Sequence, residues 1–194
     1  MRIVAGEFRG RELVTPSGDA TRPTAARARE ALFAVLADVR DESVLDLYAG
    51  SGALGFEAIS RGAERLVLVE SSKAAQRAIK TNQSALGLDT RATLLPLRAE
   101  ACLKALERLA PFSLIFADPP WADAQAALAV LEKLAASSLL QPAARLVLEH
   151  AARTPPIQKD GSRLKLLDLR RWGDTAVTIF ELIEAPTPTP ESSS

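Results

Sequence analysis

The chain has 194 residues and no net formal charge, and 47% of its residues are hydrophobic and 25% charged. This length predicts one domain with at most a small appendage, and the composition is typical of a globular protein with a full core. No apolar run approaches the roughly 18 residues of a membrane span, and the first residues lack the apolar segment of a signal peptide. We therefore expect a cytoplasmic protein with no membrane partner.

The sequence contains few cysteine and histidine residues that could bind a metal ion. The chain has one cysteine, Cys102, and one histidine, His150, which excludes cysteine-rich zinc sites and polyhistidine sites. Cys102 lies in an apolar helical stretch and His150 follows an apolar strand, so we interpret both as structural residues. We expect no bound metal.

In chain order, the first predicted elements form a small N-terminal extension. The segments "RIVAG" and "RELVT" flank a turn at residues 6–10 and predict a β-hairpin, and residues 24–39 predict an amphipathic helix. Residues 1–30 also hold six arginines, no lysine and four acids. The planar arginine fork suits phosphates and base edges, so this segment is a candidate for nucleic-acid contact. From charge alone, a solvated surface explains it equally well.

From residue 43 onward, short apolar strands alternate with helical stretches. Nearly continuous apolar strands separated by helices indicate a parallel sheet that is covered on both faces. The expected strands are 43–48, 65–70, 92–97, 112–118 and 144–149, and the expected helices are 53–60, 73–86, 100–109 and 123–136.

Two further strands, 163–172 and 175–183, are separated only by Gly173 and Asp174 and predict an antiparallel hairpin. The fold class predicted is therefore α/β, with a doubly wound, mostly parallel sheet of seven strands that ends in this hairpin. We expect an N-terminal extension over 1–40, a core domain over 41–184 and a disordered, proline- and serine-rich tail over 185–194.

A glycine-rich loop, "DLYAGSGALG" (46–55), follows the first core strand. Gly50, Gly52 and Gly55 form the G-x-G-x-x-G pattern, which permits close backbone approach to a nucleotide and is also found in dehydrogenases. The carboxylate of Asp46 would repel a diphosphate but attract an ammonium or sulfonium group. Glu70 ends the second strand, where it can accept hydrogen bonds from ribose hydroxyls. These residues favour S-adenosylmethionine over NAD.

A second motif, "LIFADPPW", ends in Asp118-Pro119-Pro120-Trp121 just beyond the fourth strand, where open sheets bind their ligands. The two prolines fix the backbone and remove two N–H donors. What remains is a rigid loop of carbonyls and one carboxylate beside an aromatic ring. Such a loop suits the exocyclic amine of a flat base.

These motifs resemble known families. "DPPW" is similar to the [DN]-P-P-[FYW] motif of S-adenosylmethionine-dependent amino-methyltransferases. More narrowly, "MRIVAGEFRGREL", "TRPT…RARE", "VLDLYAGSGALGFEAISRGA" and "RRWGDTAVTIFEL" resemble the RsmD-type 16S ribosomal RNA guanine methyltransferases, over residues 1–183. The resemblance implies a Rossmann-like class I methyltransferase that methylates the 2-amino group of a guanine in 16S ribosomal RNA, free or within an assembling small subunit.

The resemblance also implies roles for particular residues. It assigns to the cofactor Asp46, Tyr48, Gly50, Ser51, Gly52, Glu70 and Ala99. It assigns to the target base, as the catalytic set, Asp118, Pro119, Pro120 and Trp121. We expect RNA phosphates to be held by the arginines of the extension, Arg9, Arg11, Arg22, Arg27 and Arg29.

Two positions depart from the family pattern. Ala26 stands where the family usually has an aspartate in T-R-P-T-x-D-R-x-R-E. Arg98 stands where members commonly carry an Asp or Asn that contacts the adenine amine. A guanidinium cannot accept that hydrogen bond, so we expect the backbone at Ala99 or a neighbouring side chain to replace it.

Other functions stay open at this point. The same chemistry could act on adenine in DNA or RNA, or on a protein glutamine, although Asp118 in place of asparagine argues against the glutamine enzymes. A non-catalytic RNA-binding assembly factor is an alternative of a different class. Because no surplus apolar surface is indicated, we expect a monomer.

Overall fold

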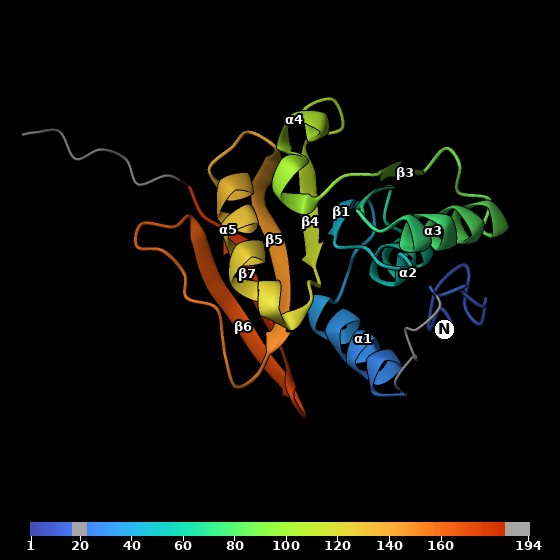
Figure 1. Ribbon diagram of the computed structural model, residues 1–194, viewed down its shortest axis with the longest axis horizontal. Coiled ribbons are helices and arrows are strands. Elements are labelled where there is room, and N and C mark those ends of the chain that lie inside the picture. Colours follow the sequence, from blue (N-terminus) through green and yellow to red (C-terminus); the bar gives the residue numbers. More distant parts are fainter. Residues whose placement is uncertain (17–22, 185–194) are drawn as a thin grey trace, which may run out of the picture.

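A computed structural model describes residues 1–16 and 23–184, with side chains omitted for 23–27. Seven strands form one sheet in the order β3-β2-β1-β4-β5-β7-β6, and β7 alone runs in the direction opposite to the other six (Figure 1). This is the fold of class I methyltransferases. The strands are β1 Ser43–Leu47, β2 Arg65–Val69, β3 Ala92–Leu95, β4 Phe112–Ala117, β5 Leu140–Ala151, β6 Leu164–Trp172 and β7 Thr175–Leu182.

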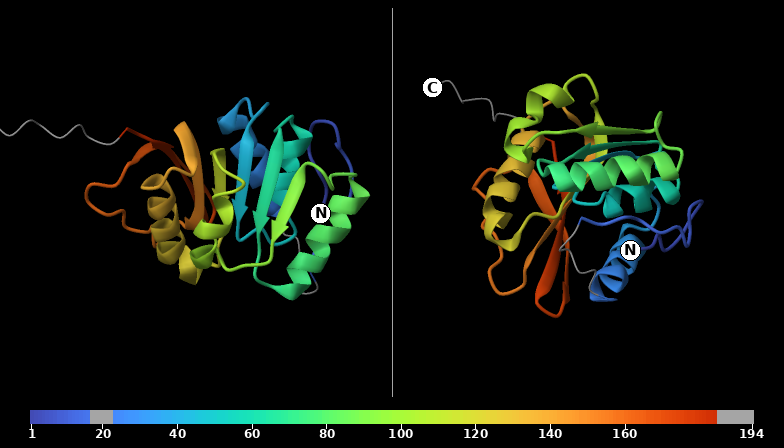
Figure 2. Two further views of the ribbon diagram at one scale, coloured as in Figure 1. Left: turned by 90° about the horizontal axis from the view of Figure 1, so that it is seen from above. Right: turned by 45° about the vertical axis from the view of Figure 1, so that its right-hand side comes forward.

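Helices cover both faces of the sheet, with α5 on the opposite side from α1 and α2 (Figure 2). Alternate residues of β1 enter the two cores: Leu45 and Leu47 pack with α5, whereas Val44 packs with α1 and α2. All five residues of β1 are buried, including the polar Ser43 and Asp46, as expected for an inner strand of a sheet that is covered on both faces. The helices are α1 Pro23–Leu36, α2 Ala53–Ser60, α3 Lys73–Ala85, α4 Leu103–Leu106 and α5 Ala124–Ala135, with short 3-10 turns η1 Ala99–Ala101 and η2 Trp121–Asp123.

The predicted sheet, its order of strands and helices, and the terminal hairpin are confirmed. The prediction of one helix over 100–109 is wrong. Hydrogen bonds between residues three apart, from Cys102 N–H to Ala99 and from Leu109 N–H to Leu106, interrupt the helical pattern and leave only η1 and α4. The expected tail, 185–194, lies outside the described residues.

The N-terminal hairpin forms only in part. An antiparallel bridge joins Arg2 and Glu12, and the N–H of Ile3 donates to the carbonyl of Arg11 at 3.0 Å. The segment does not extend into strands, because its next backbone donors are used elsewhere. The N–H groups of Val4 and Ala5 bond to a side chain of α2.

That side chain is Glu57, which fixes the N-terminal segment to the core. Its buried carboxylate accepts from the N–H of Val4 at 2.8 Å and of Ala5 at 3.0 Å. It also accepts from Arg61 Nε at 2.9 Å and lies 3.5 Å from Arg29 Nε. Each charge is compensated by partners, as burial requires.

A second buried link is made by Asn82 of α3. Its side-chain oxygen accepts from the N–H of Val14 at 2.7 Å. Its amide nitrogen donates to the carbonyl of Val14 at 2.9 Å and to that of Ser51 at 3.0 Å. One side chain therefore connects the N-terminal segment to the glycine-rich loop.

Within the described parts of the chain, no helix has the length and apolar character of a transmembrane span.

Replacing Glu57 by alanine should destabilise the protein by about 3–5 kcal/mol, because it leaves Arg29 buried without its counter-charge. Urea unfolding measures this change. Glu64→Ala, at an exposed glutamate one turn beyond α2, is the control and should stay within about 0.5 kcal/mol of the wild type. Equal effects of the two substitutions would contradict a structural role for Glu57.

Candidate active site

A cavity of about 1430 Å³ opens at the carboxyl ends of β1, β2, β4 and β5. Open parallel sheets bind ligands at this edge. The turn between β6 and β7 and residues 15–16 complete its wall. Of the residues predicted for the cofactor and the base, those that line it are Asp46, Tyr48, Gly50, Ser51, Glu70, Ala99, Asp118, Pro120 and Trp121. Gly52 and Pro119 are buried and are not part of the lining.

The glycine-rich loop requires glycine for two different reasons. Gly52 has a φ of +80°, and a Cβ there would lie 2.5 Å from the ring of Phe56. At Gly55 a Cβ would lie 2.6 Å from the side chain of Leu66, because α2 approaches β2 closely. The loop can therefore turn sharply from β1 into α2 and bring its backbone to the edge of the cavity.

Asp46 is almost fully buried near the end of β1, and its Oδ2 accepts the N–H of Gly55 at 3.0 Å. Burial raises the pKa of this carboxyl from 3.8 to about 8, against the opposing effect of that hydrogen bond. The charges of Asp118 and Glu70 contribute to this rise. An anion held at such a cost fits a cationic ligand, whose charge would favour the ionised form.

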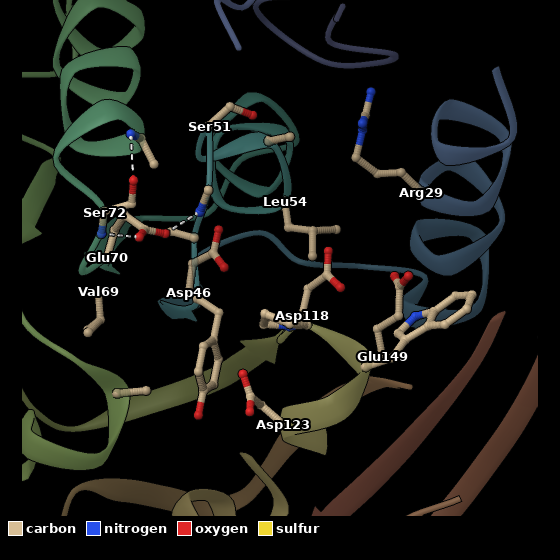
Figure 3. A pocket seen from close by; sticks show the side chains of 18 of the residues that line it. Arg29, Asp46, Ser51, Leu54, Val69, Glu70, Ser72, Asp118, Asp123 and Glu149 are labelled. Atoms are coloured by element: carbon tan, nitrogen blue, oxygen red, sulfur yellow. Dashed lines mark hydrogen bonds between the residues drawn. The ribbon is translucent and has the colours of Figure 1, made fainter. Parts of the chain in front are cut away.

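Glu70 has a different environment although it lies in the same cavity. Its Oε2 accepts the N–H of Gly50 at 2.8 Å and its Oε1 accepts the N–H of Ser72 at 2.6 Å (Figure 3). These bonds fix both oxygens and leave each a further lone pair. Two oriented acceptors fit a pair of neighbouring hydroxyls such as those of a ribose.

Tyr48 and Ala99 also line the cavity. The Tyr48 hydroxyl donates to Glu100 at 2.9 Å, which holds its ring at the cavity wall. Ala99 is buried at the start of η1. The guanidinium of Arg98 is exposed and lies 3.8 Å from Glu100.

The Asp118 loop follows β4 and begins beside the glycine-rich loop, because β4 pairs with β1. Pro119 is buried, whereas Trp121 is 43% exposed and begins η2. The carboxyl group of Asp118 opens into the cavity, but the protein that surrounds it raises its pKa. The loop thus offers a carboxylate and an aromatic ring on one wall.

One acidic residue of this wall, Glu149, is missed by the sequence analysis. It follows Leu148 of β5, which pairs with Ala117 of β4, so it stands beside Asp118. Burial and the charge of Asp118 both raise its pKa. The available signal was its place at the end of the predicted apolar strand 144–149, which has no flanking prolines or glycines of the kind that mark the other two loops.

The predicted RNA-binding arginines divide into two groups. Arg9 and Arg11 are exposed. Arg29 is only 5% exposed, and it donates to the carbonyl of Arg2 at 2.6 Å and pairs with Glu57. Its guanidinium points from the cavity toward the N-terminal segment (Figure 3), which does not fit a phosphate contact. The described part of the structure does not include Arg22, nor the side chains of Ala26 and Arg27.

Comparison with known proteins gives the family. The model of a family described as conserved hypothetical protein 95 matches residues 1–181. The protein belongs to this family. Its members include "Putative rRNA methyltransferase YlbH" of Bacillus subtilis, 33% identical over 183 residues that cover 93% of this chain and 98% of the relative. The E. coli "Ribosomal RNA small subunit methyltransferase D" is 37% identical over 122 residues, 62% of this chain and 60% of the relative.

Solved structures agree with this assignment. "Putative methyltransferase yhhF from Escherichia coli" has a TM-score of 0.78 at 30% identity and covers 96% of this chain and 99% of its own. A more distant methyltransferase of the same fold, SMU.776, is complexed with SAH, the demethylated form of S-adenosylmethionine. It has a TM-score of 0.65 at 15% identity, covers 90% of this chain and 52% of its own, and shows the shared fold alone. The family is that of the RsmD/YlbH S-adenosylmethionine-dependent methyltransferases.

The raised pKa of Asp46 leads to a pH dependence of stability without ligand. The folded protein holds the proton of Asp46 more tightly than the unfolded chain does. The contribution of Asp46 to stability is therefore full below pH 3.8 and is lost as the pH rises toward about 8. Asp46→Asn removes this loss. The free energy of unfolding of the variant, measured relative to that of the wild type, should therefore rise by more than about 2 kcal/mol between about pH 4 and about pH 8. One pKa unit corresponds to about 1.4 kcal/mol.

Urea unfolding of both proteins at the two pH values measures this gain. A constant difference in unfolding free energy would contradict the raised pKa of Asp46. The same substitution should weaken binding of S-adenosylmethionine, because it removes the charge that a cationic ligand requires.

Proposed function

We propose that this protein transfers a methyl group from S-adenosylmethionine to the 2-amino group of a guanine in 16S ribosomal RNA. One observation carries the proposal: the acidic residues of the glycine-rich region and the acidic residue of the Asp118 loop line a single cavity. Asp46 and Glu70 lie by the glycine-rich loop, and Asp118 and Trp121 line the same cavity from the loop that follows the neighbouring strand β4. The family assignment and the substrates in the names of the relatives support the same function.

The first group of residues would hold the cofactor. Glu70 would accept from the ribose hydroxyls, Asp46 would compensate the positive charge, and the backbone at Ala99 would border the adenine. When bound, S-adenosylmethionine supplies a methyl group that its sulfonium already activates. The protein therefore has no need to generate the electrophile.

The second group would hold the base. The Asp118 carboxylate and the Pro119 carbonyl would accept the two N–H groups of the amine, and this draws its lone pair out of the ring. Alignment of the nitrogen is the larger contribution, since positioning is worth about 7–11 kcal/mol of a barrier. Trp121 would stack on a base turned out of its helix, a contact worth about 1–3 kcal/mol. The ionised Asp118 can also take the proton that the methylated amine releases.

The direct test is methyl transfer from labelled S-adenosylmethionine to small-subunit RNA from cells that lack this protein. Nucleoside analysis of the product should show 2-methylguanosine. The assay is run on naked 16S RNA and on isolated small subunits, which also identifies the accepted form of the substrate. Label in adenosine, or label only in protein, would contradict the proposal.

Substitutions at Asp118 should separate chemistry from cofactor binding. Asp118→Ala removes the acceptor of the amine, so turnover should fall by at least about 100-fold, the usual range for loss of an oriented polar group in catalysis. Asp118→Asn keeps one acceptor oxygen and should retain measurable activity. Calorimetry should show that S-adenosylmethionine affinity changes much less in both variants. Wild-type turnover in Asp118→Ala would show that the catalytic loop lies elsewhere.

The exposed arginines of the extension should contribute to RNA affinity. The double variant Arg9→Ala, Arg11→Ala should weaken RNA binding and reduce the slope of log K against log salt by up to about 2, one for each phosphate contact. Binding of small-subunit RNA at several salt concentrations measures the slope, with S-adenosylmethionine affinity as the control. An unchanged slope would leave these arginines as solvated surface.

A further inference from the structure

Asp118 and Glu149 stand side by side at the carboxyl edge of the sheet. Strands β4 and β5 are parallel, and their register pairs Phe116 with Val147 and Ala117 with Leu148. The next residue of each strand carries a carboxyl group. In a parallel pair, residues in register point to the same side, and both side chains extend into the cavity (Figure 3).

Neither carboxyl group bonds to any of the residues that the structure describes. The buried glutamates nearby differ in this respect, since Glu57 and Glu70 each accept hydrogen bonds through both oxygens. The surrounding protein raises the pKa of both Asp118 and Glu149, and the charge of Asp118 raises that of Glu149 further. The wall therefore has a row of acceptors that a ligand with adjacent N–H groups would satisfy.

We propose that Glu149 determines the specificity for guanine by accepting the N1–H of the target base. This inference rests on the function proposed above, in which Asp118 and the Pro119 carbonyl accept the two N–H groups of the 2-amino group. Glu149 stands next to Asp118 along the wall, as N1 stands next to the 2-amino group along the edge of the base. Its role is to select and orient the base.

The chemistry of the bases explains the selection. Guanine is the amine-bearing base in which one ring nitrogen beside the amine, N1, is a donor; N3, on the other side of the amine, is an acceptor. In adenine and cytosine the ring nitrogen beside the amine carries a lone pair, which an ionised Glu149 would repel. A site built to bond a substrate N–H rejects an analogue that lacks it by as much as about 10⁴-fold, because its own buried group is left unpaired. Glu149 thus separates guanine from adenine, which the Asp118 loop alone does not.

The test uses a base that keeps the amine but changes N1. The methylated guanine is first mapped in small-subunit RNA, and a synthetic fragment is made with guanine or 2-aminopurine at that position. 2-Aminopurine has the 2-amino group, but its N1 is an acceptor. The kcat/KM for each fragment is measured with the wild type, Glu149→Gln and a control, Asp174→Asn, which removes an exposed carboxylate at the rim of the same cavity.

The wild type should prefer guanine to 2-aminopurine by at least about 100-fold in kcat/KM. In Glu149→Gln the amide can donate to N1, so this preference should fall by at least about 10-fold, while Asp174→Asn should keep it. The absent O6 of 2-aminopurine affects all three proteins alike and cancels from the comparison. A general loss of folding or activity would lower both rates and leave the preference unchanged.

Two results would overturn the inference while the proposed function stands. One is a Glu149→Gln variant that keeps the wild-type preference. The other, which needs no variant, is a wild type that methylates both fragments equally well. If the wild type forms no 2-methylguanosine in small-subunit RNA, the proposed function itself fails, and the two failures are thereby distinguished.

Discussion

The parallel register of β1, β4 and β5 brings carboxyl groups from separate strands to one edge of the sheet. Asp46, Asp118 and Glu149 then share a cavity, while the nearby Arg29 is directed away toward Glu57. Burial and mutual repulsion favour the protonated form of these carboxyl groups, so their ionisation is costly in the free protein. A ligand that brings positive charge and N–H donors removes the cost of ionisation. The free site is thus electrostatically incomplete, and the ligands proposed for it, a sulfonium and an amine-bearing base, would supply what it lacks.

The same type of side chain serves structure in one place and binding in another, and its donors decide which. Glu57 is surrounded by backbone N–H groups and two guanidinium groups, so it is saturated and holds the N-terminal segment. Glu70 is half-satisfied: the backbone orients its oxygens and leaves acceptor capacity. Asp118 and Glu149 have no donors among the described residues and are free for a ligand.

Local patterns predicted the sheet, the order of its elements and the two loops that hold Asp46 and Asp118, because strand ends and glycine or proline motifs are visible in the sequence. Two features depend on tertiary contacts. Arg29 is one of several arginines in its segment, and nothing local shows that it meets a buried Glu57 on another helix. Glu149 has no marked loop around it, and its partnership with Asp118 follows only from the pairing of β4 with β5.

The side chain of Asn82 links the N-terminal segment directly to the glycine-rich loop. Its one amide group holds Val14 on one side and Ser51 on the other, so neither can be displaced without exposing buried hydrogen-bonding groups that the other also needs. If RNA binds to that segment and the cofactor to that loop, as proposed, the two ligands act on a common element. Thermodynamic reciprocity then requires that any factor by which one ligand changes the affinity of the other also applies in reverse.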